Sequence, residues 1–219
     1  MGDLTKRVQK TPIKYSLQLT EEQKLVKAGV WEFDVNIVLG NYGTGKTLSA
    51  CIIALDFLFR NDTGIDKIIL TRPINFNATG YLKGGIDEKM SMHIMPLKQN
   101  LYNCYGKEKI DKLFTEGIIQ VIPIDYMKGV TFMNAVTIVD EFEDIDYDDF
   151  KLILTRLGKG SKLIYTGSEE QIADEMRHLT CMPRVKLLEN SGLVGFHRLT
   201  INHRNEAILK ILNHINDNK

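Results

Sequence analysis

Apolar residues along the chain cluster into five short runs that are separated by more polar segments. The runs read VNIVLG at 35–40, KIILTR at 67–72, IIQVIPI at 118–124, AVTIVDE at 135–141 and KLIYTG at 162–167. Apolar residues stand side by side in them without strict alternation, which is typical of strands buried on both faces of a parallel sheet. Each run is therefore a predicted strand of a central sheet.

The segments between these runs have helical spacing and are long enough to cross over between parallel strands. Helices are predicted near 47–57, 88–105, 107–114 and 148–157, with a last one near 205–216. Thr20 and Gln23 have the spacing of a capping box, so another helix is expected to begin there. The pattern predicts an α/β fold in which helices flank a mostly parallel central sheet.

A chain of 219 residues, of which 43% are hydrophobic, can bury one substantial core. We expect a polar, basic arm at 1–18 and a single domain at 19–219 with a helical insertion at about 83–116. The formal net charge of zero gives no argument for a strongly basic surface. The three cysteines lack metal-ligand spacing, and no apolar run is long enough for a signal peptide or a membrane span. These features predict a cytoplasmic protein, in a bacterial cell or a phage-infected host, with neither a zinc site nor a membrane partner.

The strongest chemical signal is the segment GNYGTGKT at 40–47, which follows an apolar run and precedes a predicted helix. This context is the one that a P-loop requires. Glycines let the backbone amides curl around phosphate oxygens, the lysine reaches the β and γ phosphates, and the threonine hydroxyl binds Mg²⁺. We therefore predict that ATP binds here with Mg²⁺. The predicted nucleotide-binding residues of this segment are Gly40, Asn41, Tyr42, Gly43, Thr44, Gly45, Lys46, Thr47 and Leu48.

Polar residues also follow two other predicted strands. Asp140 and Glu141 end the run AVTIVDE, and Gln171 lies four residues beyond the glycine that ends KLIYTG. Ligands of α/β sheets bind at the carboxyl ends of strands. Asp140 and Thr47 are predicted to hold magnesium, and Glu141 to polarise the attacking water. The Gln171 amide both donates and accepts hydrogen bonds, so it is the predicted sensor of the γ-phosphate.

Three arginines are further candidates. Arg72, at the end of KIILTR, could contact a nucleic-acid backbone, since a guanidinium binds phosphate bidentately. Arg156 could bind phosphate in the same way or cap the carbonyls of a helix. Arg204, just before the last predicted helix, is a candidate for stabilising the transferred charge, with a surface salt bridge as the alternative.

With these pieces in order, the chain resembles the PhoH family of ATPases, whose fold is similar to one RecA-like domain of superfamily 1 helicases. The resemblance extends from about Thr20 to the C-terminus. Besides the P-loop, it rests on the following segments: TRP at 71–73, GYLKGGIDEKM at 80–90, MPL at 95–97, YMKGVTF at 126–132, LTRLGKGSK at 154–162, TGSEEQ at 166–171 and NSGL at 190–193.

The resemblance implies a RecA-like P-loop NTPase that hydrolyses ATP and forms a homo-oligomer, with a hexameric ring favoured. It also implies a role for each matching residue: Gln23 would read the adenine, Lys46, Thr47, Asp140 and Glu141 would form the hydrolytic centre, Gln171 would sense the γ-phosphate, and Arg204 would match the arginine before the last helix. Where the family usually has MRGRT and TGD, this chain has MKGVT and Ser168. These departures look like those of a divergent phage-borne member.

Three functions from different classes fit these residues. The first is an ATPase that acts on single-stranded RNA or DNA. Its predicted groove is lined by basic side chains, with one tyrosine to stack a base: Arg72, Lys83, Lys89, Lys128 and Tyr81. The second is a nucleotide or small-molecule kinase, and the third is a nucleotide-gated scaffold with little turnover.

Overall fold

The computed structural model describes residues 18–73, 93–173, 176–203, 210–211 and 214. Nearly all of the predicted arm at 1–18 and of the predicted helix at 205–216 lies outside the described residues. The described part forms a six-stranded sheet in the order β3-β2-β4-β5-β1-β6, in which each neighbouring pair is parallel. The strands are β1 (Val35–Gly40), β2 (Lys67–Thr71), β3 (Ile119–Val121), β4 (Ala135–Asp140), β5 (Lys162–Gly167) and β6 (Gly195–Leu199).

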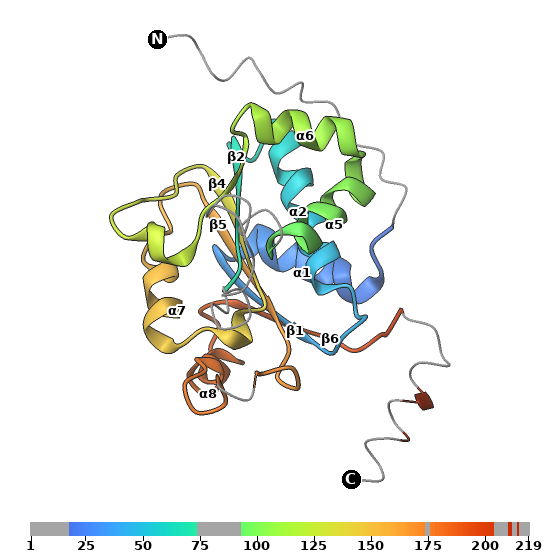
Figure 1. Cartoon of the computed structure of the whole chain (residues 1–219), viewed down its shortest axis with the longest axis vertical. Helices are drawn as coiled ribbons and strands as arrows, with labels where there is room; N and C mark the ends of the chain where they lie inside the picture. Colours follow the sequence, from blue (N-terminus) through green and yellow to red (C-terminus); the bar gives the residue numbers. More distant parts are fainter. Residues whose placement is uncertain (1–17, 74–92, 174–175, 204–209, 212–213, 215–219) are drawn as a thin grey trace, which may run out of the picture.

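Helices cover both faces of this sheet (Figure 1). One face carries α1 (Glu21–Glu32), α2 (Lys46–Phe59), α5 (Met95–Tyr105) and α6 (Lys107–Thr115). The other carries α7 (Tyr147–Leu154), α8 (Met182–Val185) and the short 3₁₀ turns η2 (Ile124–Met127), η3 (Phe142–Asp144) and η5 (Lys186–Leu188). The predicted arrangement of helices around a parallel sheet is confirmed.

The alternation of side chains along each strand supplies both halves of the core. On β1, Val38 points into the layer with α2, whereas Ile37 and Leu39 point into the layer with α7. On β4, Ile138 and Val139 divide in the same way. Because both faces are covered, the central strands need apolar residues at successive positions, and this need explains the continuous apolar runs in the sequence.

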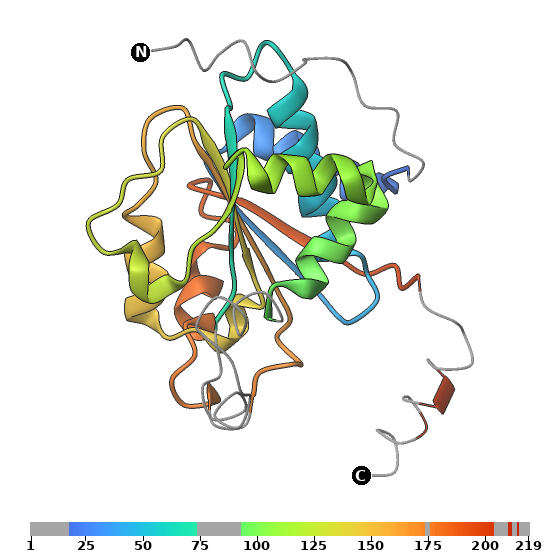
Figure 2. The same ribbon diagram turned by 45° about the horizontal axis from the view of Figure 1, so that its top comes forward.

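Helices α5 and α6 lie between β2 and the edge strand β3 in the chain; α5 packs on α2, and α6 packs on α5 and β3 (Figure 2). Leu97, Leu101 and Ile110 are fully buried between these helices and the sheet. The part of the predicted insertion that the structure describes is therefore helical and contributes to the core. Its residues 83–92 lie outside the described part of the chain.

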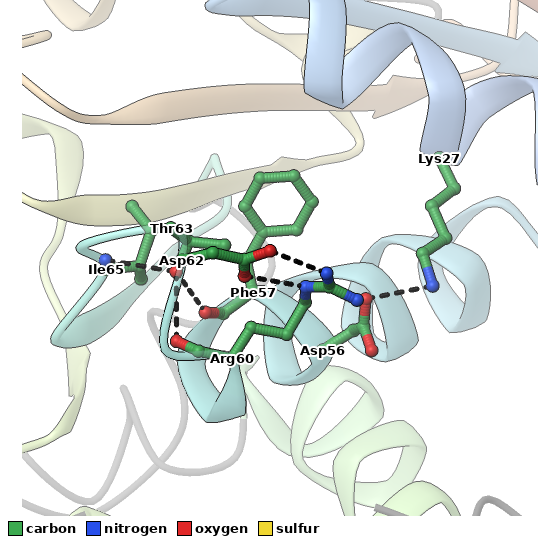
Figure 3. Close-up of polar contacts among 7 residues, drawn as sticks. All are labelled: Lys27, Asp56, Phe57, Arg60, Asp62, Thr63 and Ile65. Carbon is green, nitrogen blue, oxygen red and sulfur yellow. Dashed lines mark hydrogen bonds and ion pairs between the residues drawn. The ribbon is translucent and has the colours of Figure 1, made fainter. Parts of the chain in front are cut away.

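Polar contacts fix the far end of α2 against α1 (Figure 3). The Lys27 ammonium on α1 lies 2.9 Å from the carboxylate of Asp56 on α2. After α2 ends, Arg60 binds Asp62 through two nitrogens, and the Thr63 hydroxyl donates to a carbonyl in the last turn of the helix. The first contact joins α1 to α2, whose first turns lie beside the predicted P-loop, and the others fix the turn that ends α2.

Helix α1 begins as the sequence predicts. The Thr20 hydroxyl accepts a hydrogen bond from the Gln23 amide, and the Gln23 side chain accepts one from the Thr20 amide. This capping box satisfies two amide groups that have no partner within the helix. In the described ranges, no helix is both long and apolar enough to span a bilayer.

Candidate nucleotide-binding site

The sheet order brings the predicted site residues together at the carboxyl ends of three adjacent strands. Strand β5 lies between β1, which leads into the P-loop, and β4, which ends in Asp140. A cavity of about 290 Å³ opens at these strand ends. It is lined by Tyr42, Gly43, Gly45, Lys46, Thr47, Leu48, Asn100, Asp140, Glu141, Glu143, Thr166, Gly167 and Gln171.

The loop between β1 and α2 has the backbone conformation that its glycines allow. Gly43 and Gly45 have φ values of 80° and 79°, in the left-handed region that glycine adopts without strain. Helix α2 begins at Lys46, so its positive end faces the cavity. The Lys46 ammonium donates to the carbonyls of Gly40 and Asn41 at 2.6 and 3.0 Å. The lysine thus lies inside the curl of the loop, beside the space that a phosphate group would take.

Asp140 is the buried carboxylate of the site. Its Oδ1 accepts hydrogen bonds from the hydroxyls of Thr47 and Thr166, both at 2.7 Å, and the residue is only 4% exposed. Burial raises the pKa of Asp140, and the two hydroxyl donors oppose this rise. A threonine hydroxyl next to a carboxylate is an oxygen donor set that suits Mg²⁺, which keeps most of its other ligands as water or phosphate. Thr47 and Asp140 therefore fit the predicted metal site.

Glu141 has an unusual backbone conformation next to this carboxylate. Its φ is 54°, in the left-handed region, where the chain turns from β4 into η3. Its carboxylate forms an ion pair with Arg72 at the end of β2. The Arg72 side chain is only 15% exposed, so it lies against the predicted catalytic acid rather than on the open surface.

The remaining predicted residues differ in where they lie. Gln171 lines the cavity, as the prediction of a γ-phosphate sensor requires. Gln23 is 5% exposed, and its Nε2 donates to the Thr44 carbonyl at 3.2 Å, so its amide packs against the P-loop backbone. Lys128 is exposed at the end of η2. Tyr81, Lys83, Lys89 and Arg204 lie outside the described residues.

Comparison with known proteins shows the family of this chain. A family model described as "PhoH-like protein" matches residues 17–215. The chain belongs to the PhoH family. It is 39% identical to a PhoH-like protein of Synechocystis over 152 residues, which are 68% of this chain and 45% of that protein. It is 37% identical to a PhoH-like protein of Bacillus subtilis over 155 residues, which are 70% of this chain and 48% of that protein. The chain spans about half the length of these two curated relatives.

Solved structures with a similar arrangement include the Pif1 helicase from Candida albicans. The similarity covers 90% of this chain and 44% of that one, with a TM-score of 0.47 and 15% sequence identity. In this chain, strand β5 separates β1, which leads into the P-loop, from β4, which ends in Asp140. The six-stranded parallel sheet with helices on both faces is the α/β arrangement that the sequence predicts.

Four residues that line the cavity were not predicted from the sequence, namely Asn100, Glu143, Thr166 and Gly167. Thr166 stands near the end of the run KLIYTG, and its hydroxyl donates a hydrogen bond to Asp140. Glu143 belongs to the acidic block DEFEDIDYDD at 140–149, in which only Asp140 and Glu141 were predicted as site residues, yet it is 2% exposed and lines the cavity. Burial raises the pKa of Glu143 to about 8. A run of acids has no periodicity that could single out the one that turns inward.

Proposed function

We propose that this chain binds MgATP at the P-loop and hydrolyses it. The observation that carries the proposal is the hydrogen bond between the Thr47 hydroxyl and the buried Asp140 carboxylate, which joins the P-loop to the acid strand. A turn rich in glycine, taken alone, has no need of such a partner. This pairing is what a site for a triphosphate and its metal ion requires.

Each residue of the site has a distinct proposed role. Lys46, whose ammonium donates to two loop carbonyls, would contact the phosphates, and Thr47 and Asp140 would hold Mg²⁺, which would neutralise charge on the phosphate oxygens. Glu141 accepts a proton from the attacking water and orients it. Gln171 senses the γ-phosphate. Arg72 pairs with the Glu141 carboxylate, so Glu141 would have to leave this ion pair to accept the proton of the water.

Coupling to single-stranded RNA or DNA is the finer part of the proposal. Arg72, Lys83 and Lys128 are the proposed contacts with the nucleic-acid backbone, and the exposure of Lys128 supports its part in this. Binding to nucleic acid would draw Arg72 toward phosphate and release Glu141. This exchange would explain how nucleic acid could stimulate ATP hydrolysis.

Oligomerisation is proposed on the same basis. A RecA-like domain that acts alone needs an arginine from elsewhere to stabilise the transferred charge. We propose a cytoplasmic homo-oligomer, with a hexameric ring favoured, in which Arg204 of one subunit acts on ATP bound to the next. Mixing wild-type protein with Arg204→Ala protein tests this proposal. Activity that falls only in proportion to dilution would argue against a shared site.

The main test is phosphate release measured with and without single-stranded RNA or DNA at low salt. Lys46→Ala should abolish nucleotide binding, whereas Glu141→Gln should retain binding and lose turnover. Wild-type turnover that ignores both nucleic acids would remove the coupling. Tight binding without phosphate release would identify a nucleotide-gated scaffold, and transfer of phosphate only to an added acceptor would identify a kinase.

A further inference from the structure

Three successive carbonyls of the P-loop accept hydrogen bonds from groups outside the loop. The Tyr42 carbonyl accepts from Nδ2 of Asn202 at 2.7 Å, and the Gly43 carbonyl from the backbone amide of His203 at 2.9 Å. The Thr44 carbonyl accepts from Nε2 of Gln23 at 3.2 Å. We call Gln23, Asn202 and His203 the carbonyl clamp.

The first turn of α1 and the segment after β6 assemble this clamp. Oε1 of Gln23 accepts from the Thr20 amide at 3.1 Å, and this contact directs the other end of the side-chain amide toward the loop. The neighbouring Glu22 carboxylate accepts from the amide and hydroxyl of Thr200 at 2.9 and 2.5 Å, and from the Ile201 amide at 3.2 Å. In Figure 1, the segment that leaves β6 passes beside the turn between β1 and α2. The helix and the segment therefore support each other and the loop.

The clamp has a direct consequence for the amides of the loop. The carbonyl and the amide of one planar, trans peptide group point in opposite directions. Holding the carbonyls of residues 42–44 from outside therefore directs the amides of residues 43–45 toward the other side of the loop. Gly43 and Gly45 line the cavity, and the Thr44 amide has a long contact of 3.4 Å with the Asn41 carbonyl across the loop. Amides directed inward in this way form an anion-binding concavity.

The position of Gln23 also bears on base recognition. A Cβ atom built at Gly45 would lie 2.6 Å from Nε2 of Gln23, so the glutamine amide lies directly against the loop backbone. Its oxygen accepts a hydrogen bond from the Thr20 amide at the start of α1, and its nitrogen donates one to the Thr44 carbonyl. Both ends of the amide are therefore engaged in structural contacts, and the residue is 5% exposed.

We propose that Gln23 and Asn202 are positioning residues that preset the P-loop amides for phosphate, and that Gln23 has this role instead of reading adenine. This inference rests on the proposed binding of a triphosphate at the P-loop. It predicts that each side chain contributes the same amount of binding free energy to every triphosphate, whatever base the triphosphate carries. Tripolyphosphate, which has no base, should therefore lose as much affinity as ATP when either side chain is replaced.

The test compares Gln23→Glu and Asn202→Asp, which place an acceptor opposite a loop carbonyl, with Gln23→Met and Asn202→Leu, which remove the same donor without adding a charge near the phosphates. Calorimetry with Mg²⁺ would measure the Kd of ATP, GTP and inorganic tripolyphosphate for the full chain. An unpaired polar group at such a site weakens binding about tenfold. We expect each variant to raise all three Kd values by a common factor of this size.

Thr20→Ala is the matched control, because it removes the hydroxyl of the capping box and leaves the contact between Gln23 and Thr44. It should lower the melting temperature while the Kd of tripolyphosphate stays within about twofold of wild type. If Gln23→Glu fails to fold, Asn202→Asp carries the test, since Asn202 lies in a segment outside the sheet.

Two results would overturn the inference alone, and a third would overturn the proposed function with it. A Gln23→Glu variant that loses affinity for ATP but retains it for GTP and tripolyphosphate would show that Gln23 reads the adenine. Unchanged Kd values for all three ligands in all four variants would show that the clamp does not position the amides. Wild-type protein that binds none of the three ligands would overturn the proposed function together with the inference.

Discussion

Replacing Thr166 by valine tests how the site keeps Asp140 ionised. Asp140 accepts two hydrogen bonds at Oδ1, and the one from Thr166 is lost in Thr166→Val while the shape of the side chain is retained. A hydrogen bond to a charged group contributes about 1.5–3 kcal/mol. Losing this bond should therefore raise the pKa of Asp140, and each 1.4 kcal/mol or so corresponds to a tenfold change in the protonation equilibrium. Burial already raises this pKa, so the variant adds to an existing shift in the same direction.

The sign of the effect on activity follows from the charge that the metal needs. Magnesium binds the ionised carboxylate, so a higher pKa of Asp140 keeps the site protonated up to a higher pH. The acidic limb of kcat/KM for MgATP should therefore move up by about 1–2 pH units in Thr166→Val. The assay is phosphate release at one fixed Mg²⁺ concentration below saturation across this limb, together with the Mg²⁺ concentration needed for half-maximal rate at neutral pH.

Thr137→Val provides the matched control. Thr137 is fully buried on the same strand as Asp140, and among the described residues its hydroxyl oxygen has no hydrogen-bond partner. Valine at this position should leave the pH profile unchanged and cost little stability. The reasoning fails if Thr166→Val leaves the acidic limb in place, or if Thr137→Val moves it equally far.

Three further predictions concern the core and the loop. Glu143, with a folded-state pKa of about 8, keeps its proton where the unfolded chain loses it, so the free energy of unfolding falls as pH rises from about 4.5 to about 8. Glu143→Gln should remove this pH dependence and add on the order of 3 kcal/mol to the free energy of unfolding by urea at pH 7. An unchanged slope of stability against pH would contradict this. Tyr165→Phe removes the buried hydroxyl that donates to the Phe150 carbonyl at 3.2 Å, and should cost about 1–2 kcal/mol in the same assay; no loss would show that the bond contributes nothing. Gly40→Ala places a Cβ 2.6 Å from the Leu199 carbonyl, and should weaken ATP binding at least about tenfold by shifting the loop; wild-type affinity would refute this.

The central strands could be predicted from the sequence because burial on both faces leaves a continuous apolar run. The two edge strands, β6 and β3, were predicted less accurately than the central strands. Strand β6 carries His197 and Arg198 at partly exposed positions, so it has no such run and was not predicted. Strand β3 ends at Val121, earlier than the predicted run, since Pro123 has no amide to donate to a neighbouring strand.

In the candidate site too, some residues could be predicted from local sequence and others depend on the fold. Glycine spacing and strand ends are local features, so the P-loop, Asp140 and Gln171 could be placed before the fold was known. The pairing of Arg72 with Glu141 depends on β2 lying next to β4, which is a property of the sheet order. The contact of Gln23 with Thr44 likewise depends on how α1 packs, and no pattern within either segment predicts it.

The left-handed backbone of Glu141 has a consequence for how this position tolerates change. A side chain in that conformation costs on the order of 1 kcal/mol relative to glycine, and asparagine also adopts it more readily than glutamate. Glycine or asparagine at position 141 would relieve this strain, but it would also leave the Arg72 guanidinium, whose side chain is 15% exposed, without its carboxylate partner. Because leaving a largely buried guanidinium unpaired costs more than the strain, the acid at position 141 serves the stability of the fold as well as the proposed chemistry.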